Sequence, residues 1–473
     1  MRCFFAGGRY SVFDVGGAGG AAGGGAGEHP AAKINSVASA RVFMPDILRS
    51  GGSLYSAFVE GSWVALVPPK AFAADVAPPG SKSTSNRALV CAALADGKSR
   101  IRGFARADDT KLLILALRKL GFRIEPAAPS DLVVVGGGVT ASEAALDLGN
   151  AGTSFRFALA VAALGTGRYT LDGEPRMRER PIGGLVEALR VLGSKIEYAG
   201  VDGFPPVRVA ASGLSGGRVR VDSTASSQFL SALLLVSPLA RGPVEIENAG
   251  PVSSAGYVDM TRRVMKSFGG EAGRYRGTDY TVEADAASAG YWAALAAVTG
   301  GRVRIHGVRP DGTQPESGFL HDLSAMGATV KADADGTIVE GVALRGIDAD
   351  LNGRPDSVPA LAVTALFAEG PTRIRNVAHL RHKESDRLAA LAHELGKLGA
   401  RVSEHRDGLD IDPPASVKRA ELDTHRDHRL AMAFAIAGAR VEGILIRDPG
   451  VVSKSYPGFW NAVAHAGVEL RWS

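Results

Sequence analysis

Small polar side chains and cations stand together at several separated points of the chain. Lys82 lies between Ser81 and Ser83, and Arg87 follows about one helical turn beyond Ser83. Two further clusters have the same character: Asn150-Ala-Gly-Thr with Arg156, and His428 with Arg429. A cation in the first turn of a helix opposes the helix dipole, so three such cations indicate an external anion. The alternative is that each cation faces solvent.

Two carboxylates stand among further cations. Asp356 begins a predicted apolar helix, where it could be a plain N-cap, and Glu384 adjoins Lys383, where it could belong to a solvated loop. Acids among cations can transfer protons when their pKa values lie near the working pH. His428 could do the same, although a single His is more often structural. The surrounding cations are Arg176, Arg178, Arg180, Arg381, Lys383, Arg387 and Lys454.

No Walker A motif, HExxH motif or distinct Ser/His/Asp order is present. Cys3 and Cys91 have no ligand spacing, so we expect neither a disulfide framework nor a metal site. The predicted chemistry is therefore acid–base and electrostatic catalysis on small anionic substrates, without a metal or cofactor.

Six repeats from residue 81 onward must position these side chains. Each unit contains an apolar helix, a short Gly-led strand, a polar loop, an amphipathic helix, a glycine and another strand. A helix that is apolar on every face lies inside a domain, whereas an amphipathic helix lies on its surface. We therefore expect an α/β fold of two closed domains with three units each. The glycines expected to end the outer helices in the left-handed conformation are Gly121, Gly193, Gly269, Gly327, Gly399 and Gly467.

The six inner helices share one further property, because each begins with small polar residues. Capping alone explains such residues. If equivalent helix ends meet at one cleft, however, their free N–H groups and dipoles can bind anions. The residues are Ser81 and Ser83, Asn150 and Thr153, Ser226 and Ser227, Asp285 and Ser288, Asp356 and Ser357, and Asp427.

Composition sets the broad class. The chain has 473 residues, of which 45% are hydrophobic and 22% charged, as expected for a globular protein of two or three domains. No run of about 18 apolar residues predicts a membrane span. The net charge of +5 fits a binder of small anions as well as a nucleic-acid binder. Aromatic residues are only 6%, with no stripe of them beside basic residues, so we expect no nucleic-acid partner.

Residues 1–66 differ from the rest of the chain. The Gly/Ala tract at 16–27 is typical of a low-complexity, disordered extension. Arginines and serines allow an organelle transit peptide, although four acidic residues count against it. A third interpretation takes Met44 as the true start. We leave all three open and expect domain 1 to comprise 67–79 and 284–473, and domain 2 to comprise 80–283, with the chain crossing near 280–284.

Seven motifs in order resemble the 5-enolpyruvylshikimate-3-phosphate synthase family, from about residue 70 to the C-terminus. They are Gly80-Ser-Lys-Ser-Thr-Ser-Asn-Arg, Gly149-Asn-Ala-Gly-Thr-Ser-Phe-Arg, Arg176-Met-Arg-Glu-Arg-Pro, Ser226-Ser-Gln-Phe-Leu, Arg381-His-Lys-Glu-Ser-Asp-Arg, Asp427-His-Arg-Leu-Ala-Met and Val452-Ser-Lys-Ser-Tyr-Pro. The resemblance implies the enolpyruvyl transferase fold, an inside-out α/β barrel with three βαβαββ units around buried parallel helices in each domain.

The resemblance also implies a reaction. The 5-hydroxyl of shikimate 3-phosphate would attack phosphoenolpyruvate, and phosphate would leave. Implied catalytic residues are Asp356 as proton acceptor, Glu384 as proton donor, Lys82, Lys454 and His428. Implied contacts to shikimate 3-phosphate are Lys82, Ser83, Arg87, Ser226, Ser227, Gln228, Ser254, Asp356 and Lys383. Implied contacts to phosphoenolpyruvate are Lys82, Asn150, Gly152, Arg156, Arg180, Gln228, Arg387, Arg429 and Lys454.

Some positions depart from the family pattern. Phe157 stands where many members have Pro, and the loop 252–257 lacks a common Lys-Pro, which makes Ser254 and Tyr257 less secure. His379 stands where many relatives have Asn and is left out of the site.

Two rivals are kept: a UDP-N-acetylglucosamine enolpyruvyl transferase, which usually carries a reactive Cys on a mobile loop, and a catalytically inactive anion-binding module. We expect a cytoplasmic monomer without membrane contact, or a plastid or other organellar protein if 1–66 is a transit peptide.

Overall fold

The computed structural model describes residues 62–270 and 273–473, and the statements below concern these residues. The described residues belong to one compact unit. Within its described part no helix is long and apolar enough to cross a membrane. The low-complexity tract at 16–27, the alternative start Met44 and Cys3 lie outside the described residues.

One strand pattern recurs through the described residues. In each of five four-stranded sheets the first strand pair is parallel and the next two pairs are antiparallel. Two of them are β12(Asp279–Thr281)-β3(Lys98–Arg102)-β5(Asp131–Val135)-β4(Arg123–Ala128) and β6(Glu143–Asp147)-β7(Arg168–Asp172)-β9(Val207–Ala210)-β8(Lys195–Tyr198). Two more are β2(Ala73–Val76)-β13(Arg302–His306)-β15(Gly336–Glu340)-β14(Thr329–Ala332) and β17(Asp348–Asp350)-β19(Thr372–Arg375)-β21(Gly408–Asp412)-β20(Arg401–His405). The fifth is β22(Glu421–Leu422)-β23(Leu445–Arg447)-β1(Trp63–Leu66)-β24(Leu470–Trp472).

The sixth unit keeps only the parallel pair of this pattern. This pair is β10(Gly217–Val221) with β11(Val244–Asn248), and a small additional pair is β16(Leu344–Arg345) with β18(Ala368–Glu369). The sixfold repetition expected from the sequence is therefore visible in the strand pairing itself.

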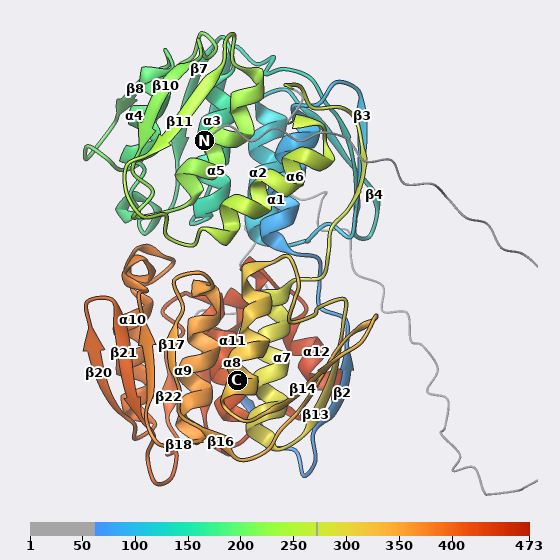
Figure 1. The fold of residues 1–473 in the computed structure, drawn as a ribbon, viewed down its shortest axis with the longest axis vertical. Coiled ribbons are helices and arrows are strands. Elements are labelled where there is room, and N and C mark those ends of the chain that lie inside the picture. The colour runs from blue at the N-terminus through green and yellow to red at the C-terminus, as the bar shows by residue number, and fades with distance from the viewer. Residues whose placement is uncertain (1–61, 271–272) are drawn as a thin grey trace, which may run out of the picture. The chain divides into compact units, whose positions relative to one another are not determined.

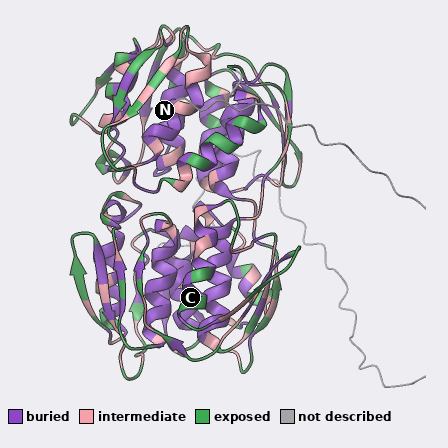
Figure 2. Ribbon diagram, viewed as in Figure 1, coloured by how far each residue is buried: buried purple, intermediate pink, exposed green. Residues whose placement is uncertain are grey.

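Inner and outer helices alternate along the chain, as the apolar pattern predicts. The inner helices are α1(Lys82–Ala93), α3(Gly152–Ala163), α5(Gln228–Val236), α7(Ala286–Thr299), α9(Val358–Thr364) and α11(His428–Gly438). The outer helices are α2(Asp108–Lys119), α4(Gly183–Val191), α6(Gly256–Ser267), α8(Phe319–Ala325), α10(Arg387–Lys397) and α12(Phe459–His465). The inner helices are buried nearly throughout, whereas the strands show exposed residues at intervals (Figures 1 and 2).

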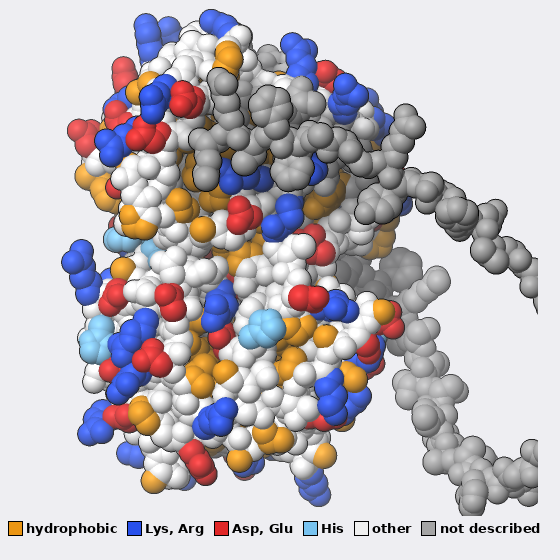
Figure 3. All heavy atoms as spheres, viewed as in Figure 1, with side chains coloured by type: hydrophobic (Ala, Val, Ile, Leu, Met, Phe, Trp, Pro, Cys, Tyr) orange, Lys and Arg blue, Asp and Glu red, His pale blue; other side chains and the backbone are white. Residues whose placement is uncertain are grey.

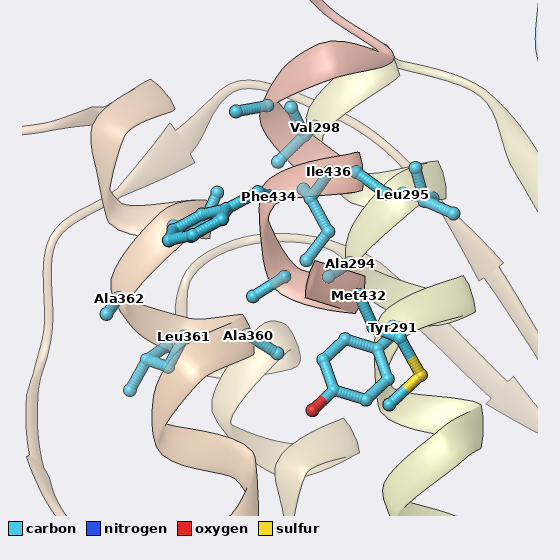
Figure 4. Close-up of a cluster of buried hydrophobic side chains, with 14 of the residues drawn as sticks. Tyr291, Ala294, Leu295, Val298, Ala360, Leu361, Ala362, Met432, Phe434 and Ile436 are labelled. Carbon is cyan, nitrogen blue, oxygen red and sulfur yellow. The ribbon is translucent and has the colours of Figure 1, made fainter. Parts of the chain in front are cut away.

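Two hydrophobic cores account for this arrangement. One gathers buried residues between 88 and 282, and the other joins residues 64–72 to residues 286–468. Figure 4 shows side chains of α7, α9 and α11 in the second core, with Tyr291 and Phe434 pointing between the helices. Such side chains each contribute about 1.5–3 kcal/mol when fully buried.

The ends of the helices follow the sequence only in part. Each glycine expected after an outer helix has a positive φ, between 77° and 116°. Ser81, Asp285 and Asp427 cap their helices through side-chain oxygens. The expectation fails for α3, α5 and α9, whose N-caps make no side-chain hydrogen bond. Asp356 instead lies in a short 3-10 turn, η5(Pro355–Ser357), where it binds arginines.

The chain crosses between the two core regions twice, near residues 80 and 284, and the two crossing segments lie side by side. Gly80 forms a bridge with Ala284, and Ser81 N–H donates to the carbonyl of Glu283 at 2.8 Å. A Cβ at position 80 would lie 1.8 Å from the carbonyl oxygen of Gly103, so only glycine fits there.

The N-terminal strand begins earlier than the boundary at 66 suggests. Trp63–Leu66 forms β1, which pairs antiparallel with both β23 and β24 in the interior of its sheet. Val64 and Leu66 are buried in the second core. The apolar Trp-Val-Ala-Leu stretch is short, and its strand character comes from partners near the far end of the chain.

Candidate active site

A pocket lies where the starts of α1, α3, α5 and α11 meet the turn before α9. Fourteen of the eighteen residues proposed from the sequence line it: Lys82, Ser83, Arg87, Gly152, Arg180, Ser226, Ser227, Gln228, Ser254, Asp356, Lys383, Glu384, Arg387 and Arg429. The lining includes residues of both core regions. Helix starts, cations and two carboxylates therefore share one concave site.

Asp356 is held by two arginines. Its Oδ1 accepts from Nη1 of Arg387 at 3.0 Å, and its Oδ2 accepts from Nη2 of Arg429 at 2.7 Å. Burial raises the pKa of this carboxyl, but the charges of Arg429 and Lys383 outweigh burial and bring the pKa well below its usual range. Asp356 is therefore ionised at neutral pH in this structure.

Glu384 lies beside the same guanidinium. Its Oε2 accepts from Nη2 of Arg387 at 2.7 Å, and Nη1 of Arg180 lies 3.8 Å from its Oε1. Burial again raises the pKa, but Arg387 and Arg180 lower it well below the usual value. Arg387 also binds Asp427 at 2.8 Å, so this fully buried cation holds three carboxylates.

Two lysines converge on Asp109, which the sequence analysis missed. Its Oδ2 lies 2.8 Å from Nζ of Lys82, and its Oδ1 lies 2.7 Å from Nζ of Lys454. Lys454 also donates to the backbone carbonyl of Asn150 at 2.9 Å. Two acids at the start of an amphipathic helix are typical of an ordinary helix N-terminus, so the sequence held no signal for this contact.

Arginines also crowd the start of α3. Nη1 of Arg180 donates to the carbonyl of Asn150 at 2.9 Å, and Nη1 of Arg156 donates to Oε1 of Gln228 at 3.0 Å. Burial and the nearby Arg180 lower the pKa of Arg156 well below its usual value. A Cβ at Gly152 would lie 2.3 Å from Nη2 of Arg180, so glycine allows both guanidiniums to reach this helix start.

Arg87 is enclosed by two aromatic rings. Its guanidinium carbon lies 5.4 Å from the ring centre of Phe157 and 5.7 Å from that of Tyr257. Nε donates to Oγ1 of Thr261 at 2.7 Å, and burial lowers the pKa of Arg87 to about 10. Phe157 thus lies in the core behind Arg87 and is absent from the pocket lining.

Four proposed residues adjoin the pocket without lining it: Asn150, Arg156, His428 and Lys454. Three of them contact residues of the pocket lining: Asn150 accepts from Arg180, Arg156 donates to Gln228, and Lys454 pairs with Asp109. His428 is fully buried, and its ring nitrogens have no hydrogen-bond partner among the described residues. Burial, followed by the charge of Lys82, lowers its pKa well below the usual value, so the ring is neutral.

The sequence analysis also left out His379, Tyr257, Thr153, Ala225 and Ser253, which line the pocket with Asp109. Nε2 of His379 lies 3.2 Å from Oγ of Ser254, and burial lowers the pKa of this His to about 3. Tyr257 reaches Asp356 with its hydroxyl. No group of three or more metal-ligating side chains occurs among the residues that the structure describes.

Charged side chains elsewhere are mixed in sign. On the face seen in Figure 3, Lys and Arg alternate with Asp and Glu, and no single-sign stripe is visible. Several cations do gather around the pocket among the described residues, where Lys82, Arg180, Lys383, Arg387 and Arg429 line it.

Comparison with solved structures identifies the class. The enolpyruvyl transferase NikO from Streptomyces tendae shares the fold, with a TM-score of 0.71 at 19% identity over 88% of this chain and 99% of that one. EPSP synthase from Acinetobacter baumannii has a TM-score of 0.73 at 29% identity, over 87% of this chain and 100% of that one. The fold is that of an enolpyruvyl transferase.

Sequence comparison then gives the family. The model of EPSP synthase (3-phosphoshikimate 1-carboxyvinyltransferase) matches residues 66–463. The 3-phosphoshikimate 1-carboxyvinyltransferase of Syntrophobacter fumaroxidans is 47% identical over 82% of this chain and 95% of its own length. The 3-phosphoshikimate 1-carboxyvinyltransferase of Shewanella amazonensis is 44% identical, also over 82% of this chain and 95% of its own length. The chain belongs to the EPSP synthase family, the transferases that act in the shikimate pathway.

Proposed function

We propose that the protein transfers the enolpyruvyl group of phosphoenolpyruvate to the 5-hydroxyl of shikimate 3-phosphate, releasing phosphate. The observation that carries this proposal is the pocket, in which two ionised carboxylates, the buried Glu384 and the partly buried Asp356, lie among cations and helix starts. Both substrates are anionic, and such a site offers them charge-assisted hydrogen bonds.

Shikimate 3-phosphate is assigned to the side of the pocket where hydroxyl groups and Arg87 gather. Its proposed contacts are Lys82, Ser83, Arg87, Ser226, Ser227, Gln228, Ser254, Asp356 and Lys383, all of which line the pocket. Four serine hydroxyls and the N-termini of α1 and α5 supply donors suited to a phosphate.

Phosphoenolpyruvate is assigned to the arginine-rich side. Its proposed contacts are Lys82, Asn150, Gly152, Arg156, Arg180, Gln228, Arg387, Arg429 and Lys454. Arg387 and Arg429 each donate to a carboxylate of the protein in the present structure. A substrate carboxylate or phosphate can take over such bonds, because guanidinium groups bind both anions in the same bidentate manner.

The first chemical step needs a base at the 5-hydroxyl. Asp356 would accept the hydroxyl proton while the oxygen attacks C2 of phosphoenolpyruvate. Its pKa is low while Arg387 and Arg429 are bound to it. When the substrate anion takes those cations, the pKa of Asp356 rises and the carboxylate becomes a stronger base.

The same step needs an acid at C3. Glu384 would deliver this proton, and an incoming anion beside Arg387 and Arg180 raises its pKa toward the protonated form. In the second step the methyl carbon returns a proton, the double bond re-forms and the C2–O bond to phosphate breaks. Lys82 and Lys454 would stabilise the negative charge on the leaving phosphate.

His428 is retained as a catalytic neighbour. The charges of Lys82 and Glu384 both act on the pKa of its ring, which is neutral and fully buried. Because the ring does not line the pocket, its proposed contribution is to fill the space beneath these charged groups and exclude water from it.

A thiol-dependent transferase fits this pocket less well. Cys91 is fully buried in α1, and burial raises the pKa of its thiol far above the usual value. No cysteine is among the residues that line the described pocket.

We further propose that residues 80–283 form one domain and that 62–79 with 284–473 form the other, which begins before the expected residue 67 because β1 pairs with β23 and β24. The two separate cores and the paired backbone at Gly80 and Ala284 support this division. The protein would act as a cytoplasmic monomer.

Phosphate release from phosphoenolpyruvate tests the reaction. Purified protein without added metal is offered shikimate 3-phosphate or UDP-N-acetylglucosamine. Release with the first acceptor only is expected. Release with the second acceptor only would move the function to the rival transferase, and no release would leave an anion-binding module.

A further inference from the structure

A further buried carboxyl group, Glu316, lies outside the pocket lining and has no role in the reaction described above. It belongs to η4(Pro315–Gly318) and is only 3% exposed. Its Oε1 lies 2.7 Å from the hydroxyl of Tyr257, and that hydroxyl lies 3.1 Å from Oδ2 of Asp356. Glu316 thus reaches Asp356 through a single phenol group.

The hydroxyl of Tyr257 lies between Glu316 and Asp356 but cannot donate to both of them. Tyr257 has one O–H and can donate it to only one of the two carboxyl oxygens. Its pKa lies well above the usual value because of burial and the nearby Asp356 and Glu316, so the phenol itself stays protonated. If both carboxyls were ionised, one of them would face the lone pairs of the phenol oxygen. One carboxyl must therefore supply a second proton.

Glu316 is the group that carries this proton. Asp356 has two arginine partners, whereas no Lys or Arg forms an ion pair with Glu316 in the described part of the chain. Burial, then the charge of Asp356, raises the pKa of Glu316 to about 7. The charges that face it are Asp356 and Asp285, which raise its pKa, and Arg429, which lowers it, while Arg87 lies near enough for Glu316 to raise the pKa of that arginine.

We propose that protonated Glu316 is a positioning residue that donates to Tyr257, so that the Tyr257 hydroxyl donates to Asp356. This order gives Oδ2 of Asp356 a second donor beside Arg429 and so fixes the orientation of the carboxylate. When Glu316 loses its proton, the phenol turns its O–H toward Glu316, the shorter contact, and its lone pairs face Asp356. The effects expected on kcat rest on the proposed function, whereas the proton on Glu316 does not.

Variants at 316 and 257 test this arrangement. Glu316→Gln presents an N–H donor to Tyr257 and mimics the protonated acid, whereas Glu316→Ala removes the donor. We expect Glu316→Ala and Tyr257→Phe to lower kcat about 10- to 100-fold, the worth of a hydrogen bond to a charged group. Glu316→Gln should retain most of the wild-type kcat below pH 7.

The pH dependence of kcat distinguishes a positioning role of Glu316 from a role in packing alone. Wild-type kcat should fall as pH rises through the pKa of Glu316, and Glu316→Gln should lose this alkaline decline. In a Tyr257→Phe background the Gln substitution should have no further effect. Glu394→Gln is the matched control, because Glu394 is a fully buried carboxylate bound to Lys397 and His425 outside the pocket lining. Its pH profile should match that of the wild type.

Two outcomes would overturn the proposal: an unchanged alkaline decline in Glu316→Gln, or equal damage from Gln and Ala. An infrared measurement keeps the test independent of activity. The wild type should show the C=O band of a protonated carboxyl that disappears as pH rises past 7, and Glu316→Gln should lack it. If that band is absent from the wild type, the proposal fails even when phosphate release succeeds. If it is present in a protein without phosphate release, only the proposed function fails.

Discussion

The ammonium nitrogen of Lys454 lies 2.7 Å from Oδ1 of Asp109, a residue 345 positions earlier in the chain. Lys82 holds the other oxygen of the same carboxylate. Asp109 thus balances two buried cations in the absence of a ligand. A bound phosphate would bring a second anion to the same lysines.

Asp109→Asn should destabilise the protein by about 3 kcal/mol, because it leaves two buried lysines without their counter-charge. Saturating phosphate or phosphoenolpyruvate should restore more of the melting temperature in this variant than in the wild type. Thermal unfolding with and without ligand measures both effects. Asp322→Asn is the control, since it breaks a pair with Arg354 outside the pocket lining and should gain nothing extra from the ligand. Equal ligand shifts in both variants would contradict the prediction.

Asp356→Asn and Glu384→Gln should each lower kcat by about 10²- to 10⁴-fold, the usual worth of a general acid or base. Both substitutions preserve shape while removing proton transfer. Steady-state phosphate release measures the loss, and circular dichroism checks that the variants are folded. A kcat within about threefold of the wild type, against that general acid–base expectation, would remove the residue from its proposed role.

Binding of phosphoenolpyruvate should take up protons from solution at neutral pH. Glu384 and Asp356 have pKa values below their usual range because arginines are bound to them. An anion that occupies those arginines raises both pKa values, and the carboxyls then bind protons more strongly. Calorimetry in buffers of different ionisation enthalpy measures the uptake. Glu384→Gln should reduce it, and proton release on binding would contradict the argument.

Phe157→Leu should weaken binding of shikimate 3-phosphate through Arg87. The aromatic ring that stacks on this buried guanidinium is worth about 1–2 kcal/mol, or roughly 5- to 30-fold in Kd. The affinity for phosphoenolpyruvate alone should change little. Phe155→Leu, on the same helix and equally buried, controls for the loss of core volume. Equal losses in both variants would show that packing, and not the ring, is responsible.

Two truncations separate the described strand β1 from the residues before it. Removing residues 1–61 should preserve phosphate release, whereas removing 1–66 should lower stability and activity together. The reason is that Trp63–Leu66 pairs with β23 and β24, and Val64 and Leu66 are buried in the core. The sequence alone placed 1–66 outside both domains. Full activity and an unchanged melting temperature in the longer truncation would restore that view.

The repeats were predictable because their pattern is local. Apolar runs, amphipathic runs and the glycine after each outer helix recur within single units, and the structure confirms inner helices, outer helices and positive φ at those glycines. Motif order likewise predicted the family. Fourteen proposed site residues line one pocket because equivalent helix starts meet there.

The tertiary structure decided the rest. Asp109 is an ordinary helix-start acid until Lys82 and Lys454 approach it, and Asp356 is a plausible N-cap until two arginines bind it. β1 is a short apolar stretch until strands from the far end of the chain pair with it. Local propensity fixes what a segment can become, but charge balance and strand pairing depend on residues hundreds of positions away.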